Sequence, residues 1–368
     1  MIASVTLIDR GNSVKAVIQT KFPVHRASLS LYDAIFKDEF NEDEPYDLKA
    51  HVFHIPKEIF REGSEAVFSY RTLLRPKLQS DRSETVLLPG SAFVEPAELL
   101  AGTNSGIVVQ RSEEEQLFPG LKCSDLFCVD SENAPVRMFT VEADMKNVTV
   151  YVGTKNDGVR NTRARATIPE MVQAAEKKGK NVLAAVNADF FDINGDFHPA
   201  GLCVKNGAVI ANPDSKRPFI GVTKDGTAVI TSLIESPGIL DRLDCAASGL
   251  EMLLKDGEIY DVALGEPFGY VRHPRTAVGI RNDGSVVVLE VDGRIPKHSN
   301  GATLTDLALF LKSMGCVRAL NLDGGGSSAV YTKKDGELQL RTVPADLFFP
   351  TAKLIRKDFN SLLFIEKR

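Results

Sequence analysis

Residues 303–328 read TLTDLALFLKSMGCVRALNLDGGGSS and hold one complete structural unit. The apolar side chains recur at the spacing of one helix face: Leu304, Leu307, Ala308 and Leu311. Gly315 can end this helix in a left-handed conformation. The apolar residues 317–322 then predict a strand, which delivers Asn321 and Asp323 to the start of a glycine run. The stretch therefore predicts a helix that ends at Gly315, followed by a buried strand with polar residues at its C-terminal end.

The same plan occurs earlier in the chain. Thr167 and Glu170 have the spacing of a capping box with a proline in the first turn, and Gly179 lies twelve residues after Thr167, as Gly315 does after Thr303. The apolar run 182–186 predicts a second strand, and it again ends in an Asn-x-Asp motif, Asn187-Ala188-Asp189. We interpret the two units as an internal duplication.

Between and after these units lie dipeptides that favour tight antiparallel turns: Asn206-Gly207, Asp225-Gly226, Asp256-Gly257, Asp283-Gly284 and Asp335-Gly336. They predict an α+β domain with a mixed β-sheet and few helices. The apolar run 286–291, the helix at 304–314 and the strand 317–322 form a strand–helix–strand unit, which would make the two strands parallel. Asp292 and Asp323 would then lie at the same sheet edge, where ligands of open α/β units bind.

The first part of the chain has a different pattern. Residues 1–90 hold several short strand-like runs without a long helix, which predicts a β-sandwich-like domain of the immunoglobulin or fibronectin type. We interpret residues 91–135 as a connector and residues 136–368 as the domain that carries the chemistry.

Composition narrows the class of partner. The chain has 368 residues and a formal net charge of −5, without a long basic block, which argues against nucleic acid as the main partner. No apolar stretch approaches the roughly 20 residues of a membrane span. The first residues hold no signal-peptide core, so the protein is either intracellular or lacks a leader here. We expect three of the five cysteines to be small buried side chains: Cys203, Cys245 and Cys316.

Two arginines lie beside the predicted strand ends. Arg275 precedes the apolar run 277–281, and Arg294 follows Asp292 by two residues. A guanidinium offers a planar, permanently charged fork that suits a phosphate. The glycine run Gly324–Gly326 can expose successive backbone N–H groups as an anion-binding nest, to which Ser327 and Ser328 would add hydroxyl donors.

Five separated motifs together resemble the phosphodiester glycosidase family, in the family's order: Asn187-Ala188-Asp189-Phe190-Phe191, Pro274-Arg275-Thr276-Ala277-Val278-Gly279, Asp292-Gly293-Arg294, Ser299-Asn300-Gly301-Ala302-Thr303 and Asn321-Leu322-Asp323-Gly324-Gly325-Gly326-Ser327-Ser328. The resemblance covers about residues 136–368. It implies hydrolysis of the anomeric C–O bond of a sugar-1-phosphodiester such as an N-acetylglucosamine derivative, with release of free sugar and a phosphomonoester. It also implies export, with a leader absent from this chain.

Under this resemblance, Asp323 and Asp292 are the main catalytic candidates, as nucleophile or as base for water. Asp189 is a further candidate, although many family members have glycine at this position or at Ala188. Arg275, Arg294 and the glycine nest would neutralise the leaving phosphate, together with Ser327, Ser328 and Thr276. We expect Asn187 to bind sugar hydroxyls and His198 to contact the phosphate.

Two other functions fit parts of the pattern. A metal-dependent phosphodiesterase would break the P–O bond and use the three aspartates as ligands. A non-catalytic glycan-binding protein would bind a glycosyl-phosphate glycan or a small molecule without turnover. The glycosidase hypothesis requires no cofactor, although calcium or magnesium would suit the carboxylates.

Overall fold

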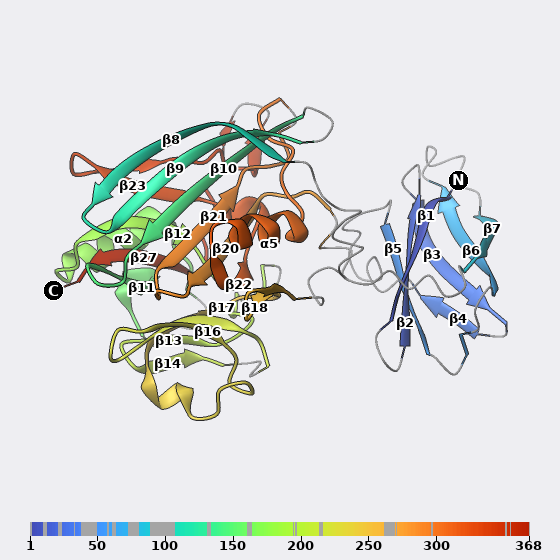
Figure 1. Ribbon diagram of the computed structural model, residues 1–368, viewed down its shortest axis with the longest axis horizontal. Coiled ribbons are helices and arrows are strands. Elements are labelled where there is room, and N and C mark those ends of the chain that lie inside the picture. The colour runs from blue at the N-terminus through green and yellow to red at the C-terminus, as the bar shows by residue number, and fades with distance from the viewer. Residues whose placement is uncertain are drawn as a thin grey trace. The chain divides into compact units, whose positions relative to one another are not determined.

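The computed structural model of the protein (Figure 1) describes residues 2–9, 13–20, 24–32, 34–37, 50–56, 59–60, 64–72, 81–88, 107–130, 134–159, 164–193, 195, 197–212, 216–260, 269, 271–295, 297–349, 352–353 and 355–367. The chain forms two compact units. The first comprises Met1–Asn104 and Leu264–Val271, and the second comprises Ser105–Ala263 and Arg272–Arg368.

The first unit contains two antiparallel sheets. One has the order β1 (Ile2–Asp9), β2 (Ser13–Thr20), β5 (Ala50–Pro56), and the other β4 (Ala34–Lys37), β3 (Val24–Leu31), β6 (Glu65–Thr72), β7 (Asp81–Leu87). Both sheets contribute to one apolar core, for example Ile18 and Phe53 from the first sheet and Leu29 and Phe68 from the second. The immunoglobulin-like or fibronectin-like assignment of this unit stays a prediction.

The second unit is built on an eight-stranded sheet. Its order is β19 (Glu258–Ile259), β18 (Met252–Lys255), β22 (Cys316–Leu322), β20 (Arg275–Arg281), β21 (Val286–Val291), β10 (Pro135–Ala143), β9 (Leu121–Val129), β8 (Val108–Phe118). The strands β21 and β22 both pair with β20 in antiparallel fashion, so they run parallel to each other with β20 between them. The expected common edge for their carboxyl ends is confirmed. The pairing differs from a mixed sheet, because every strand pair among the described residues is antiparallel.

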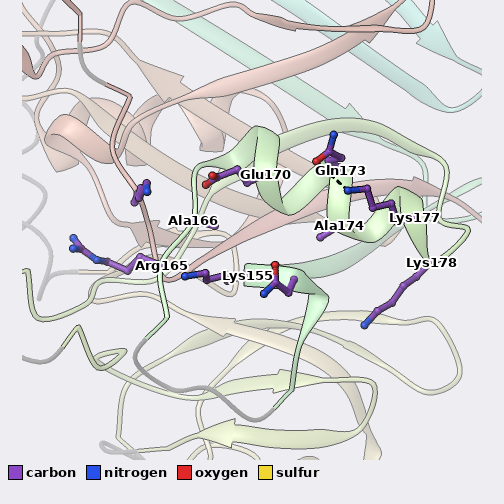
Figure 2. Close-up of a pocket in the computed structure, with 10 residues that line it drawn as sticks. Lys155, Arg165, Ala166, Glu170, Gln173, Ala174, Lys177 and Lys178 are labelled. Carbon is purple, nitrogen blue, oxygen red and sulfur yellow. Dashed lines mark hydrogen bonds between the residues drawn. The ribbon is translucent and has the colours of Figure 1, made fainter.

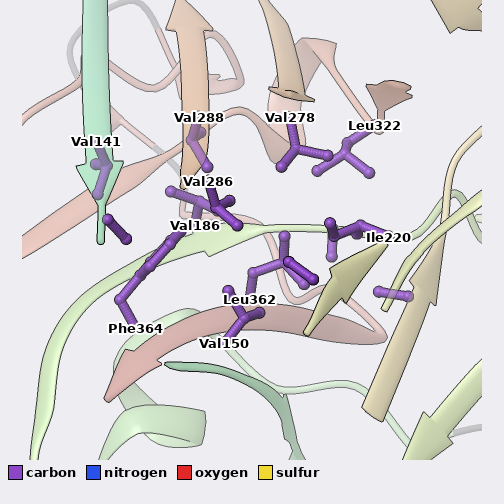
Figure 3. Packing of buried hydrophobic residues seen from close by; sticks show 14 of the residues in the cluster. Val141, Val150, Val186, Ile220, Val278, Val286, Val288, Leu322, Leu362 and Phe364 are labelled. Atoms are coloured by element: carbon purple, nitrogen blue, oxygen red, sulfur yellow. The ribbon is translucent and has the colours of Figure 1, made fainter. Parts of the chain in front are cut away.

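Two five-stranded sheets complete this unit. One has the order β11 (Val148–Thr154), β27 (Asn360–Glu366), β12 (Val182–Asn187), β23 (Val330–Lys334), β24 (Glu337–Leu340), and the other β14 (Ala208–Ala211), β13 (Cys203–Lys205), β17 (Leu243–Ser248), β15 (Phe219–Thr223), β16 (Ala228–Thr231). A short hairpin, β25 (Leu347–Phe349) and β26 (Ala352–Lys353), stands apart from them. Figure 3 shows how buried side chains of the three large sheets meet in one core, among them Val288, Val186 and Ile220. Burial of this apolar surface is the main stabilising contribution to the unit.

The described residues contain two α-helices, and both begin as the sequence predicts. Helix α2 (Ile168–Lys177) starts at Thr167 with a complete capping box, and α5 (Leu304–Ser313) starts at Thr303 with another, closed by Asp306. Helix α2 packs on β11, β12 and β27, whereas α5 packs mainly on β22 and β18. The few helices and the strand-rich domain are thus confirmed. None of the helices in the described ranges is long and apolar enough to span a membrane.

The five predicted dipeptides all link neighbouring antiparallel strands. At Asn206-Gly207, Asp256-Gly257 and Asp335-Gly336 both residues have positive φ angles, between 50° and 83°. This backbone is typical of the type I′ turn, whose twist matches the strands it joins. At Asp225-Gly226 and Asp283-Gly284 only the glycine has a positive φ.

The predicted connector 91–135 differs from the structure. Its residues 91–106 lie outside the described residues, but β8 and β9 form a hairpin at the edge of the eight-stranded sheet. The charged run Glu113–Glu115 of the predicted connector lies within β8, most of which is exposed. Charged side chains are typical of a sheet edge, because they discourage pairing with another chain. The three cysteines expected to be buried are buried and free.

Candidate active site

The two Asn-x-Asp motifs meet where β12 and β22 end. The Asn187 side-chain Nδ2 donates to the Asp323 backbone carbonyl at 2.6 Å, and the Asp323 N–H donates to the Ala188 carbonyl at 2.9 Å. Thr276 donates its hydroxyl to the Asn187 side-chain oxygen at 2.9 Å. Both Asn187 and Thr276 are fully buried. In the structure these two residues hold the backbone of Asp323, and their contact with substrate stays a prediction.

Asp323 itself is partly exposed, one residue beyond the end of β22. Burial of its carboxyl group raises the pKa to about 6, although the hydrogen bond from the Gly324 N–H and the charge of Arg356 favour the ionised form. The Gly324 N–H donates to Asp323 Oδ1 at 2.9 Å. A carboxyl group on a partly exposed residue, with a pKa raised towards neutral, is suited to act as a base or a nucleophile.

Steric crowding explains why residues 324–326 are glycines. A Cβ atom on Gly324 would lie 2.7 Å from the Pro274 carbonyl oxygen, and one on Gly326 would lie 2.1 Å from the Asp346 carboxylate. Gly325 has a φ of 62°, which favours glycine, and donates its N–H to Pro274. The N–H groups of Gly324 and Gly325 both donate within the protein, and the anion-binding nest stays a prediction. The run brings two other segments close to Asp323.

Three of the side chains nearest to this turn were missed by the sequence reading. Arg356 donates to Asp346 at 2.7 Å and 3.0 Å, and to the Ser327 hydroxyl at 3.3 Å. Ser327 donates in turn to the buried Asp358 at 2.8 Å. Burial and the nearby charge of Asp323 raise the pKa of Asp358 well above its ordinary value. The only available signal was Asp358 just before the apolar run 359–365, and it lacked a partner motif.

Arg294 is the exposed arginine of the site. Its guanidinium nitrogens lie 3.2 Å from the position of a Cβ on Gly325, so the side chain lies directly over the glycine run. Burial lowers the pKa of Arg294, Arg356 acts in the same direction, and the charges of Asp346 and Asp323 oppose the shift. The guanidinium groups of Arg294 and Arg356 thus lie close to the carboxylates of Asp323 and Asp346. Together they can neutralise a phosphate beside Asp323.

Arg275 is placed differently from its prediction. The side chain is 1% exposed, and its Nε donates to the Ala302 carbonyl at 3.3 Å. Burial lowers the pKa of Arg275 to about 9, while the negative charges of Glu251 and Asp306 oppose the shift. A guanidinium enclosed in this way supports the sheet edge from inside and does not face a solvent-borne phosphate.

Asp292 is also buried, at 1% exposure. One carboxylate oxygen lies 2.6 Å from His298 Nε2, and the other accepts the Val343 N–H at 2.9 Å. The side chain of His298 is 31% exposed. Asp292 therefore orients a histidine that reaches the surface, and the sequence reading missed that histidine because it lies six residues further along the chain.

Asp189 and His198 are two further predicted site residues, and Asp189 directly follows Ala188, whose carbonyl accepts the Asp323 N–H. Asp189 is 1% exposed and accepts a hydrogen bond from Asn360 at 2.8 Å. Burial raises the pKa of Asp189 to about 8. His198 is partly buried, and its Nδ1 lies 3.0 Å from the carbonyl of the adjacent Pro199. The structure thus brings Asp323, Ser327 and Arg294 together and leaves these two residues in supporting surroundings.

The burial of Asp189 predicts how stability depends on pH. Its carboxyl group binds a proton more tightly in the folded chain than in the unfolded chain. The folding stability that protonated Asp189 contributes is therefore complete below pH 4 and is lost as the pH rises through 8. Asp189→Asn removes this loss. Relative to wild type, the variant should gain stability between pH 5 and 8, by at most about 4 kcal/mol at roughly 1.4 kcal/mol per pH unit. Urea unfolding at both pH values measures the difference, and an equal change at both would contradict it.

Metal ligands are not gathered in the described part of the chain. Within those residues, no group of three or more histidine, cysteine, aspartate or glutamate side chains has the arrangement to hold a metal ion. Asp189, Asp292 and Asp323, which the metal-dependent alternative requires together, each have separate hydrogen-bond partners. A requirement for calcium or magnesium stays a prediction to be tested with chelators.

Comparisons with known proteins show which protein family this chain is similar to. The family model of the phosphodiester glycosidases matches residues 180–355. Human N-acetylglucosamine-1-phosphodiester alpha-N-acetylglucosaminidase is 28% identical over 182 residues, which is 45% of this chain and 34% of the human protein. The SPbeta prophage-derived uncharacterized protein YomE of Bacillus subtilis is 50% identical over 58 residues, 16% of this chain and 9% of that protein. The chain therefore spans about a third or less of the length of these relatives.

The fold is shared with a solved structure of the same family. The zebrafish N-acetylglucosamine-1-phosphodiester alpha-N-acetylglucosaminidase catalytic domain, auto-inhibited by its pro-peptide, aligns with a TM-score of 0.55 and 23% identity. The alignment covers 71% of this chain and 89% of that chain. This likeness concerns the fold. Residues 180–355 match the phosphodiester glycosidase family model and contain all five motifs, which confirms the family resemblance of these motifs.

Proposed function

We propose that the protein hydrolyses the anomeric C–O bond of a sugar-1-phosphodiester. Water supplies the oxygen that ends on the sugar, and the phosphate leaves as a monoester with the electron pair of the broken bond. The observation that carries this proposal is the position of the partly exposed Asp323, which has a pKa raised to about 6, beside the guanidinium groups of Arg294 and Arg356.

The chemistry needs two groups of opposite charge. The sugar develops positive charge as the bond breaks, and the carboxylate of Asp323 can stabilise it, either as a nucleophile or as the base for water. The phosphate gains negative charge in the same step, which Arg294 can neutralise from above the glycine run. A phosphodiester leaves as a stable anion, so little acid catalysis is required.

The decisive experiment incubates the protein with a panel of glycosyl-1-phosphodiesters in water enriched in oxygen-18. We expect NMR and mass spectrometry to find the label on the free sugar. Label on the phosphate, together with loss of activity in EDTA, would support the phosphodiesterase alternative. Binding of the panel without any turnover would support a glycan-binding protein. Export of the protein remains part of this proposal and is tested by its location in cells that produce the full gene product.

Asp292 acts in this proposal as a positioning residue through His298. Asp292→Asn can still accept the Val343 N–H, but it no longer presents a carboxylate to His298 Nε2. We expect kcat/KM to fall by about 10- to 100-fold, less than for a residue that touches the reacting atoms. His298→Gln should cause a similar loss, and the double variant little more, because the two side chains act as one unit. Additive losses in the double variant would show that Asp292 acts independently of His298.

A further inference from the structure

A cavity of about 470 Å³ lies along helix α2, and its lining does not include Asp323. Five basic side chains line it, with one carboxylate, Glu170, as Figure 2 shows for most of them: Lys155, Arg165, Lys177, Lys178 and Lys357. This local excess of positive charge stands out in a chain whose net charge is −5. Oppositely charged ligands concentrate in such a cleft.

Most of this charge is available to a ligand. Lys178 is occupied, because its ammonium contacts Asp157 at 3.2 Å. Within the described residues, none of the other four basic side chains has a carboxylate at ion-pair distance. Glu170 is committed to the helix start, where its carboxylate accepts the Thr167 N–H at 2.8 Å. The pocket therefore carries a net positive charge, although Glu170 partly offsets the charges of Lys155 and Lys357.

One wall of the pocket is held in a strained conformation. Asn156 and Asp157 both have left-handed backbone, with φ angles of 55° and 52°. The buried carboxylate of Asp157 fixes this turn, because it pairs with the buried Lys205 and accepts the Tyr151 hydroxyl at 3.0 Å. Backbone strain that is maintained by a buried ion pair is typical of binding sites, where it pre-organises the contact groups.

The pocket shares a chain segment with the Asp323 site. Ala166 lines the pocket and forms two backbone hydrogen bonds with Asp358, at 3.1 Å and 3.0 Å. Lys357 lines the same pocket, while its neighbours Arg356 and Asp358 both contact Ser327 in the active site. A ligand bound by Lys357 is therefore coupled to the Asp323 site through adjacent residues of one segment.

We propose that this basic pocket binds a second phosphate of a polymeric substrate, a chain of sugars joined by phosphodiesters, while another unit of the polymer occupies the Asp323 site. The inference rests on the proposed function and adds its substrate class. Lysines and an arginine at the pocket recognise the repeated negative charge, and Arg165 already stacks on the ring of Phe197 at 3.4 Å, which fixes its guanidinium at the rim. The polymer should therefore bind more tightly than a single unit.

The test compares two synthetic substrates, an N-acetylglucosamine-1-phosphodiester and its trimer, in which each anomeric phosphate is esterified to the next sugar. The variant Lys155→Gln/Lys177→Gln/Lys357→Gln should raise KM for the trimer about tenfold at low salt, with kcat and the kinetics of the monomer unchanged. The control Lys224→Gln/Lys312→Gln/Lys334→Gln removes the same charge from surfaces outside the pocket and should leave both substrates unaffected. Urea unfolding confirms that both variants are folded.

The outcomes separate the two proposals. No turnover of the monomer or the trimer by wild type would overturn the proposed function. Turnover of both with the same KM in wild type and in the pocket variant would overturn the pocket alone. An equal rise in KM in the control variant, or equal loss of binding to a single-stranded oligonucleotide, would show non-specific attraction of polyanions and would also overturn the pocket.

Discussion

Replacement of Asp323 by asparagine is expected to lower kcat/KM for a sugar-1-phosphodiester by about 10³-fold or more. Asparagine has nearly the same shape and can still accept the Gly324 N–H, so the turn that holds it should persist. It cannot supply the negative charge that the developing oxocarbenium ion requires. The loss should therefore appear in the chemical step, with little change in the midpoint of urea unfolding.

The same residue sets the acid side of the pH profile. Because Asp323 must be ionised to act, activity should fall as the pH drops through its pKa of about 6. Stopped assays of kcat/KM between pH 4 and 8 measure this limb in wild type. In Asp323→Asn, the residual activity should lose the limb. A variant that retains wild-type turnover, or the same limb, would remove Asp323 from the mechanism.

Arg294→Lys should lower kcat/KM by about 10²-fold, and Arg294→Gln by about 10³-fold, which is the range for loss of one transition-state donor. Lysine keeps the charge but lacks the planar fork that can bind two phosphate oxygens at once. The exposed side chain makes few contacts that stabilise the fold, so both variants should unfold at the wild-type urea concentration.

The exposed Arg242 offers a matched control, since it pairs with Asp225 at 3.7 Å on another surface. Arg242→Lys should not change turnover. If Arg294→Lys is as active as Arg242→Lys, Arg294 does not contact the leaving phosphate, and Arg356 becomes the remaining candidate of the site.

The sequence predicted what local rules determine. Both helices begin at their capping threonines, and the dipeptide turns join the expected strands, because caps and left-handed turn residues act over a few positions. The common edge for Asp292 and Asp323 also followed from the order of strand, helix and strand. The long-range strand pairing did not follow from the sequence. The strand β20, which comes earlier in the chain, lies between β21 and β22 in the sheet.

Burial at the site was the harder property to predict. Arg275 and Arg294 look alike in sequence, but one is enclosed beneath the sheet edge and the other lies over the glycine run. Asp346, Arg356 and Asp358 were missed because they reach Asp323 from a segment with no recognisable motif of its own. Their role depends on contacts that only the folded chain creates.

The hydrogen bond from Asn187 to the Asp323 backbone joins two different sheets, because β12 and β22 belong to separate ones. The candidate site around Asp323 therefore depends on residues from both sheets. A shift of one sheet relative to the other would therefore displace the Asp323 carboxyl group, so the packing of the two sheets fixes its position.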